Sequence, residues 1–302
     1  MKPLSALCGC LLLGAVHAQA QVTVEVVLDQ EQYLVNEATL VGVRVINFSG
    51  QSLKLGKDPA WMELAVEGET GLLVEKLAEP PVVEEFEVPS SSKGTRWLDL
   101  QPCFNIGRPG RYQVTASVRL PELGKELTSK PVAVTVTSGA RVWQQEFGLP
   151  PKSGETAAPP EVRRYALVQG LTGKRVRLYV RVTDSQEIKV YRVFPIGPML
   201  TFSHPETQVD AHAILHVLFQ TSARQFTYVQ VDPDGQLLAR QTHQYAASRP
   251  KLNAEPNCTI AVRGGVRIRD RSDIPKPEEA QAPAPAKQTE AAPAKDKPAH
   301  AQ

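Results

Sequence analysis

Residues 28–56 read LDQEQYLVNEATLVGVRVINFSGQSLKLG, and this stretch decides the fold class. In an extended chain its side chains Val41, Val43 and Val45 fall on one side. Alternation with a period of two residues is typical of a β-strand that buries one face. Gly50 ends the run. We therefore predict a sandwich strand with its lead-in turn here, and not a binding edge or a catalytic loop.

The same alternation recurs through residues 21–137. It is found in the runs VTVEVV (22–27), WMELAVE (61–67), RYQVTASVRL (111–120) and KPVAVTV (130–136). Glycine- and proline-containing turns separate these runs. About seven short strands at this spacing are what a sandwich of two sheets requires. The fold class predicted for the chain is therefore all-β.

The lead stretch and LDLQPCFNIGRPGRYQVTASVRL (98–120) together resemble the immunoglobulin-like sandwiches of exported bacterial proteins. The stretch is also similar to macroglobulin-type domains and to the bacterial proteinase-inhibitor family that shares this sandwich. The resemblance implies that the turn at Pro109 and Gly110 launches a late strand and that Tyr112 packs across its corner. It implies a fold and no particular activity.

A weak internal repeat marks the second half of the chain. RLYVRVTDSQEIKVYRVFPIGPML (177–200) matches ILHVLFQTSARQFTYVQVDPDGQLL (214–238), and each copy is expected to form strand, turn, strand, Pro-x-Gly turn and strand. A period near 40 residues with several strands in each unit resembles a propeller blade. We predict an antiparallel β-domain with blade-like repeats, either a small domain of its own or part of a ring.

The chain is expected to have five parts. Prolines bracket a polar stretch that is typical of a linker, and the C-terminal end has too few large apolar residues to form a core. The predicted parts are a signal peptide (1–20), an immunoglobulin-like sandwich (21–137), a linker (138–160), a blade-like antiparallel β-domain (161–271) and a disordered tail rich in Pro, Ala, Lys and Glu (272–302).

The first twenty residues have the pattern of an export signal. Lys2 is followed by an apolar core and then by the small residues of VHAQA, so cleavage is expected after Ala20. The apolar run is too short to span a bilayer, and no later segment is apolar enough to do so. Acylation at Cys10 is an alternative that we disfavour, because most of the apolar core follows that residue. The mature protein is expected in the periplasm or outside the cell.

Two cysteines remain after the signal. An oxidising compartment would allow Cys103 and Cys258 to form a disulfide between the two predicted domains. The alternative, which we favour, is that each is a small buried apolar residue.

Charge is distributed unevenly along the chain. Residues 21–140 carry 16 acidic and 11 basic side chains, whereas residues 141–272 carry 11 acidic and 18 basic ones. The two halves are expected to attract each other; a second interpretation is that the basic half faces an anionic partner.

One strand of the basic half is a candidate binding surface. Arg175, Arg177, Tyr179 and Arg181 alternate with apolar residues, and such a strip suits a phosphate, a carboxylate or an anionic sugar polymer. The alternative, which we favour, is that this side of the sheet is solvated or faces the first domain and its acids. The loop aromatics Trp61 and Trp97 are further candidates for this contact surface.

The segment HPETQVDAHAILH (204–216) is the strongest candidate for chemistry, but its histidines are spaced for a strand and not for a shared zinc ion. No nucleophile motif of a known hydrolase class is present. We therefore predict no cofactor, no metal and no catalytic residue.

The predicted function is an exported, non-catalytic binding or scaffold protein of the bacterial envelope. The partner would be an anionic envelope polymer or another envelope protein, and not a nucleic acid. One alternative is a proteinase inhibitor that acts through EPPVVEEFEVPSSSKG (79–94). Another is an enzyme with a dispersed site around His204, Asp210 and His243.

Overall fold

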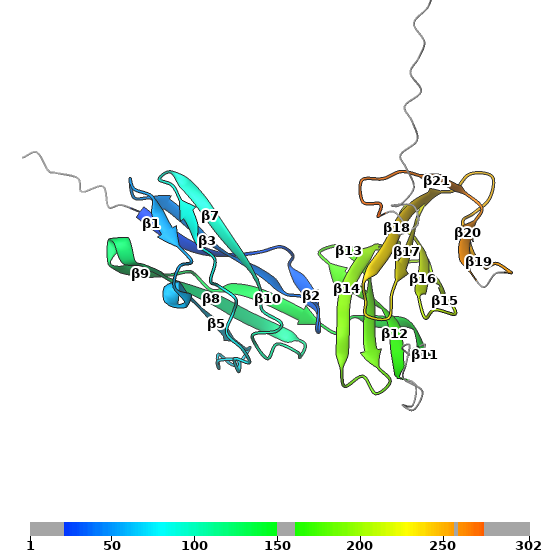
Figure 1. The fold of residues 1–302 in the computed structure, drawn as a ribbon, viewed down its shortest axis with the longest axis horizontal. Coiled ribbons are helices and arrows are strands. Elements are labelled where there is room, and N and C mark those ends of the chain that lie inside the picture. Colours follow the sequence, from blue (N-terminus) through cyan, green and yellow to red (C-terminus); the bar gives the residue numbers. More distant parts are fainter. Residues whose placement is uncertain (1–20, 150–160, 257–258, 275–302) are drawn as a thin grey trace, which may run out of the picture. The chain divides into compact units, whose positions relative to one another are not determined.

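The computed structural model describes residues 21–149, 161–256 and 259–274. Strands dominate this part of the chain (Figure 1). Helix is limited there to two 3₁₀ turns, η1 (Pro59–Trp61) and η2 (Pro121–Leu123). The chain is all-β, as predicted. No helix among the described residues is long and apolar enough to cross a membrane.

The described residues form two compact units that divide after Phe202. The predicted boundary lies earlier, at 138–160, so the strands of the predicted second domain are shared between both units. The predicted signal peptide (1–20) and nearly all of the predicted tail (272–302) lie outside the described residues.

Two sheets form the N-terminal part of the first unit. One has the order β1-β3-β7, with β1 (Gln21–Leu28), β3 (Leu40–Phe48) and β7 (Ser92–Asp99). The other has the order β2-β10-β8-β5, and β9 also pairs with β8; its strands are β2 (Gln32–Leu34), β5 (Met62–Glu67), β8 (Gly110–Leu120), β9 (Lys125–Thr128) and β10 (Val132–Thr137). A short ribbon consists of β4 (Leu53–Leu55) and β6 (Phe86–Val88). β2 pairs with β10 in parallel, and the other pairs are antiparallel.

Alternation along each strand builds a core between these two sheets. Val41, Val43 and Val45 of β3 are at most 1% exposed. They belong to the same buried cluster as Val114 and Val118 of β8, in the opposite sheet. Burying a valine contributes about 1.5–3 kcal/mol, so the shared core accounts for the pairing of the sheets. We call this body, residues 21–137, the sandwich.

Tyr112 closes one corner of the sandwich. It follows Gly110, the first residue of β8, and its hydroxyl donates to the carbonyl oxygen of Arg108 at 2.8 Å. The ring is 8% exposed, and burial raises the pKa of its hydroxyl. A tyrosine that bonds back to the chain a few residues upstream fixes the corner from which its strand starts.

A four-stranded meander completes the first unit. Its order is β11-β12-β13-β14, with β11 (Ala140–Gly148), β12 (Val162–Thr172), β13 (Arg175–Asp184) and β14 (Val190–Pro198). The linker prediction is wrong for residues 140–148, because they form β11. This edge strand is mostly exposed and polar, so it lacks the apolar alternation of the other strands. It is held by Phe147, whose ring stacks on Tyr165 at 4.2 Å.

The second unit contains a five-stranded sheet and a two-stranded ribbon. The sheet has the order β15-β16-β17-β18-β21, with β15 (Glu206–Val209), β16 (Leu215–Gln220), β17 (Gln225–Val231), β18 (Leu237–Gln244) and β21 (Val266–Ile268). The ribbon pairs β19 (Lys251–Ala254) with β20 (Ile260–Arg263).

The two copies of the repeat agree in their first hairpin and differ at the Pro-x-Gly motif. In the second copy Gly235 donates its N–H to the carbonyl of Asp232, which forms the predicted turn. In the first copy Pro195 and Gly197 lie inside β14, where Ile196 is an extra residue opposite β13. The turn predicted there is therefore a β-bulge. The propeller-blade interpretation stays a prediction.

Candidate functional site

The predicted basic strip on β13 is not a continuous exposed surface. Arg175 is exposed, but Arg177 and Arg181 are half-buried. Tyr179 is 1% exposed and packs in a cluster with Leu34 of β2. Burial also raises the pKa of the Tyr179 hydroxyl. A ligand would not reach this tyrosine ring.

Arg177 is bonded to the sandwich. Its Nη1 donates to Oε1 of Gln30 at 3.1 Å. The amide of Gln30 in turn donates to Glu37 at 2.9 Å, and Glu37, 3% exposed, also accepts from the N–H of Leu34 at 2.7 Å. Burial raises the pKa of Glu37, although these hydrogen bonds and Arg177 oppose the shift. This geometry favours the interpretation in which the strip faces the first domain.

Arg181, at the other end of the strip, lies near a set of ion pairs. Glu187 accepts from Arg141 at 2.8 Å and from Arg164 at 2.5 Å, and Arg164 also pairs with Glu146 at 2.6 Å. Burial alone would raise the pKa of Glu187, but the two arginine hydrogen bonds outweigh it and lower the pKa. Burial lowers the pKa of Arg181. Glu146 and Glu187 thus offset the positive charge of Arg141 and Arg164 in the meander.

The histidine segment contributes to a buried polar network of Asp210, His216, Tyr228 and Gln230. His216 is 3% exposed; its Nδ1 lies 2.7 Å from the Tyr228 hydroxyl and its Nε2 lies 3.2 Å from Asp210 Oδ2. Gln230 donates to the same hydroxyl at 2.8 Å. Tyr228 and Gln230 were not predicted, because only the register of β16 against β17 brings them beside His216.

This network is suited to holding β16, β17 and the turn before them together. Burial raises the pKa of Tyr228, so its hydroxyl stays protonated at neutral pH. His204 and His212 are exposed, and His243 lies edge-on to Tyr228 at 6.4 Å between ring centres. Within residues 21–149, 161–256 and 259–274, no three His, Cys, Asp or Glu side chains form a group that could hold a metal ion.

Cys103 lies in the sandwich core, 2% exposed, and forms no disulfide within the part of the chain that the structure describes. Burial raises the pKa of its thiol. Cys258 lies outside the described residues. The disulfide between them stays a prediction.

Trp61 and Trp97 have different environments. Trp61 is 4% exposed and donates its indole N–H to the carbonyl of Val82 at 3.0 Å, so it is an internal anchor and not a surface aromatic. Trp97 lies on β7 and is 46% exposed. The predicted inhibitory segment 79–94 is thereby tied down at Val82 and again at β6, while Val83 between them is 62% exposed.

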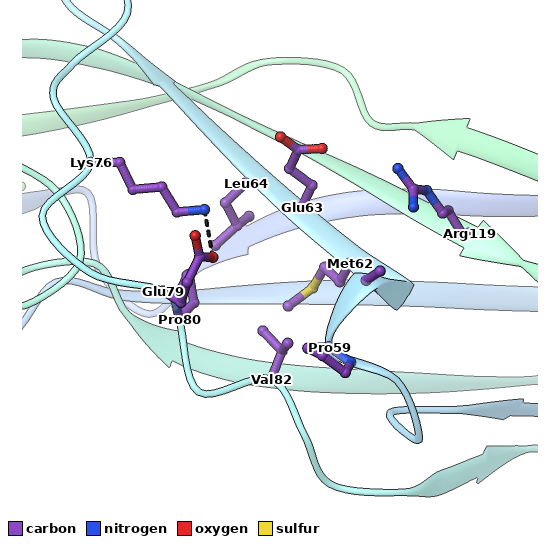
Figure 2. A pocket seen from close by; sticks show the side chains of 10 residues that line it. Pro59, Met62, Glu63, Leu64, Lys76, Glu79, Pro80, Val82 and Arg119 are labelled. Carbon is purple, nitrogen blue, oxygen red and sulfur yellow. Dashed lines mark hydrogen bonds and ion pairs between the residues drawn. The ribbon is translucent and has the colours of Figure 1, made fainter.

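Two hollows adjoin each other on the sandwich. The β5 hollow, about 320 Å³, lies between β5 and the segment 76–82, as Figure 2 shows. The η1 hollow, about 690 Å³, lies around η1 and β4. Pro59 and Arg119 line both.

The β5 hollow has an apolar floor and a charged rim. Met62, Leu64 and Val82 supply apolar surface. At one side of the hollow Lys76 pairs with Glu79 at 2.6 Å, and Arg119 lies at the opposite side (Figure 2). An apolar surface with a few polar groups around it is the usual make-up of a binding site.

The walls of the β5 hollow are fixed by backbone contacts. Leu77 and Ala78 donate their N–H groups to the carbonyl of Cys103 at 2.8 and 3.3 Å. The hydrogen bond from Trp61 holds Val82 on the same wall. The hollow is therefore formed before any partner arrives, which reduces the entropy lost on binding. Sequence reasoning missed it, because no motif marks the place where a strand edge and a loop diverge.

In comparisons with known proteins, no family model and no curated protein matches this chain.

Proposed function

We propose that this chain is an exported, non-catalytic binding protein of the bacterial envelope and that its sandwich holds a partner at the two adjoining hollows. The observation that carries the proposal is the pair of hollows, which share Pro59 and Arg119. Export is supported by the signal pattern that ends at Ala20. The β13 strip is a weaker candidate surface, because Tyr179 is buried and Arg177 is bonded to Gln30.

The exposed charges of the hollow allow a direct test. Glu63 lies on β5 and lines the β5 hollow, whereas Thr23 lies exposed on β1, in the other sheet. Mature protein, starting at residue 21, would be immobilised as wild type, Glu63→Arg and Thr23→Arg. Each form would be incubated with envelope extract from the native host.

We expect wild type and Thr23→Arg to retain the same partner and Glu63→Arg to lose most of it. Equal retention by all three forms would remove the hollow from consideration. A fusion of residues 1–40 to a reporter that is active only after export tests the compartment separately; an inactive reporter would contradict export.

A second candidate function is proteinase inhibition through residues 79–94. The observation that favours it is the exposure of Val83 between the buried Val82 and β6. An exposed segment that is fixed on both sides resists distortion by a protease. The purified sandwich-containing chain would be incubated with a panel of proteases, with Val83→Asp as the matched variant. Absence of inhibition at micromolar protein would end this candidate.

A further inference from the structure

We propose that the β5 hollow binds an extended peptide segment of a partner protein, which adds as a strand to the free edge of β5. This inference rests on the proposed function, because it takes the sandwich to be the binding body and names the class of partner. β5 is the last strand of the order β2-β10-β8-β5, so no strand from the described residues lies beside one of its two edges in the sheet.

The main-chain groups of Leu64 point to that free edge. Leu64 lies opposite Ala116 of β8. Ala116 uses its own N–H and C=O for Ser129, donating to the Ser129 hydroxyl at 3.0 Å and accepting from the Ser129 N–H at 2.8 Å. Directly opposed residues in an antiparallel pair either exchange both hydrogen bonds or neither. Leu64 and Ala116 therefore form a pair without mutual hydrogen bonds, and the N–H and C=O of Leu64 face away from β8.

The protein's own chain shows how the edge accepts a strand. After the turn at residues 68–71, Leu73 forms an antiparallel bridge with Glu67, and Val74 donates its N–H to the carbonyl of Val66 at 2.8 Å. The chain then leaves β5, because Leu77 bonds instead to Cys103. Within residues 21–149, 161–256 and 259–274 the edge is thus occupied at Val66 and vacant at Leu64, and the β5 hollow lies at the vacant part.

The lining of the hollow suits a peptide. A strand needs hydrogen-bonding groups along one edge and space for side chains above and below, and here Leu64 offers the first while the hollow of about 320 Å³ offers the second. At about 3.3 Å per residue, a few residues would follow β5 from Leu64 toward η1 and into the η1 hollow. Glu63 is exposed at this site and makes no ion pair among the described residues. A basic side chain on the added strand would pair with it.

The probes are extended peptides selected from a randomised display library against the full mature chain. Each selected peptide would be resynthesised with N-methyl groups on alternate amides, which removes main-chain donors and keeps every side chain. We expect one of the two N-methylation patterns to weaken binding by about tenfold or more and the other, whose donors face solvent, to have a smaller effect.

Amide hydrogen exchange locates the bound strand. The N–H of Leu64 should exchange rapidly in the free protein and slow down with the peptide, whereas the N–H of Ala65, which faces β8, should be slow in both states. Glu63→Arg should weaken a peptide with a central lysine, and exchanging that lysine for glutamate should restore binding. Glu67→Arg is the matched control, since that part of the edge is occupied by Leu73.

Several outcomes would overturn the inference: no peptide is selected, N-methylation has no effect, or Leu64 exchange is unchanged on binding. A concentration-dependent dimer that Glu63→Arg abolishes would assign the edge to a second copy of this chain and would also overturn it. If partner capture at Glu63 succeeds while the peptide tests fail, the proposed function stands and this inference alone fails.

Discussion

Glu37 is a sandwich residue, 3% exposed, whose carboxyl group lies close enough to Arg177 to feel its charge. Its hydrogen bonds to the Leu34 N–H and the Gln30 amide lower its pKa, yet burial has the larger effect and raises it. In the folded protein this carboxyl group therefore holds its proton to a higher pH than it does in the unfolded chain.

The free energy of unfolding should consequently fall as the pH rises from the ordinary pKa of 4.5 through the raised value. Each unit by which the pKa is raised corresponds to about 1.4 kcal/mol over that interval. Glu37→Gln should remove this part of the pH dependence and become more stable relative to wild type as the pH increases. Urea unfolding at several pH values from 4 to 8 measures it; parallel curves for the two proteins would refute the assignment.

The hydroxyl oxygen of Tyr228 forms hydrogen bonds with both His216 Nδ1 and the Gln230 amide in the second unit. Tyr228→Phe removes this oxygen while keeping the ring, so we expect a loss of about 1–3 kcal/mol in stability. Tyr245→Phe, at a ring that is 41% exposed, should change stability by less than about 0.5 kcal/mol. Thermal and urea unfolding of both variants provide the comparison, and equal effects would contradict a structural role for the network.

For the turns between elements, two glycines distinguish the cost of backbone strain from the cost of a steric clash. Gly50 and Gly56 have nearly the same φ, +84° and +85°. A Cβ on Gly50 would meet nothing within 4 Å, whereas one on Gly56 would lie 1.9 Å from the carbonyl oxygen of Glu84. The first substitution therefore measures backbone strain alone, and the second adds a steric clash beside the η1 hollow.

Gly50→Ala should cost about 1–2 kcal/mol, the penalty of a left-handed conformation for an L-residue. Gly56→Ala should cost clearly more, by at least about 1 kcal/mol beyond Gly50→Ala, because main-chain atoms must shift. Chemical denaturation of the two variants side by side measures the difference. Equal losses would mean that the approach of Gly56 to Glu84 relaxes freely.

Strands that bury one face were predictable and other strands were not. Val41, Val43 and Val45 alternate because one face of β3 lies in the core. The proline-bracketed polar composition predicts a linker where β11 lies. Most side chains of β11 are exposed, so its sequence shows no alternation of apolar and polar residues. Pro195 and Gly197 predict a turn where β14 has a bulge, since proline and glycine occur in both structures.

At the scale of the whole molecule, composition and alternation determine the all-β class, whereas the sites depend on register. The Tyr228–His216 contact and the vacant edge at Leu64 each follow from which residue lies opposite which. A shift of one residue would turn every side chain to the other face, and no local pattern in one strand specifies its partner's register. The candidate sites therefore could not be predicted from the sequence, even where the strands that carry them could.

The most direct test of the account is photo-crosslinking in living cells, with a photoreactive amino acid placed at residue 63 and, as the control, at residue 23. We expect a discrete crosslinked product from residue 63, absent from residue 23, whose partner is an envelope protein joined through an extended segment. Identical products from both positions, or none from residue 63 in cells that export the protein, would contradict it.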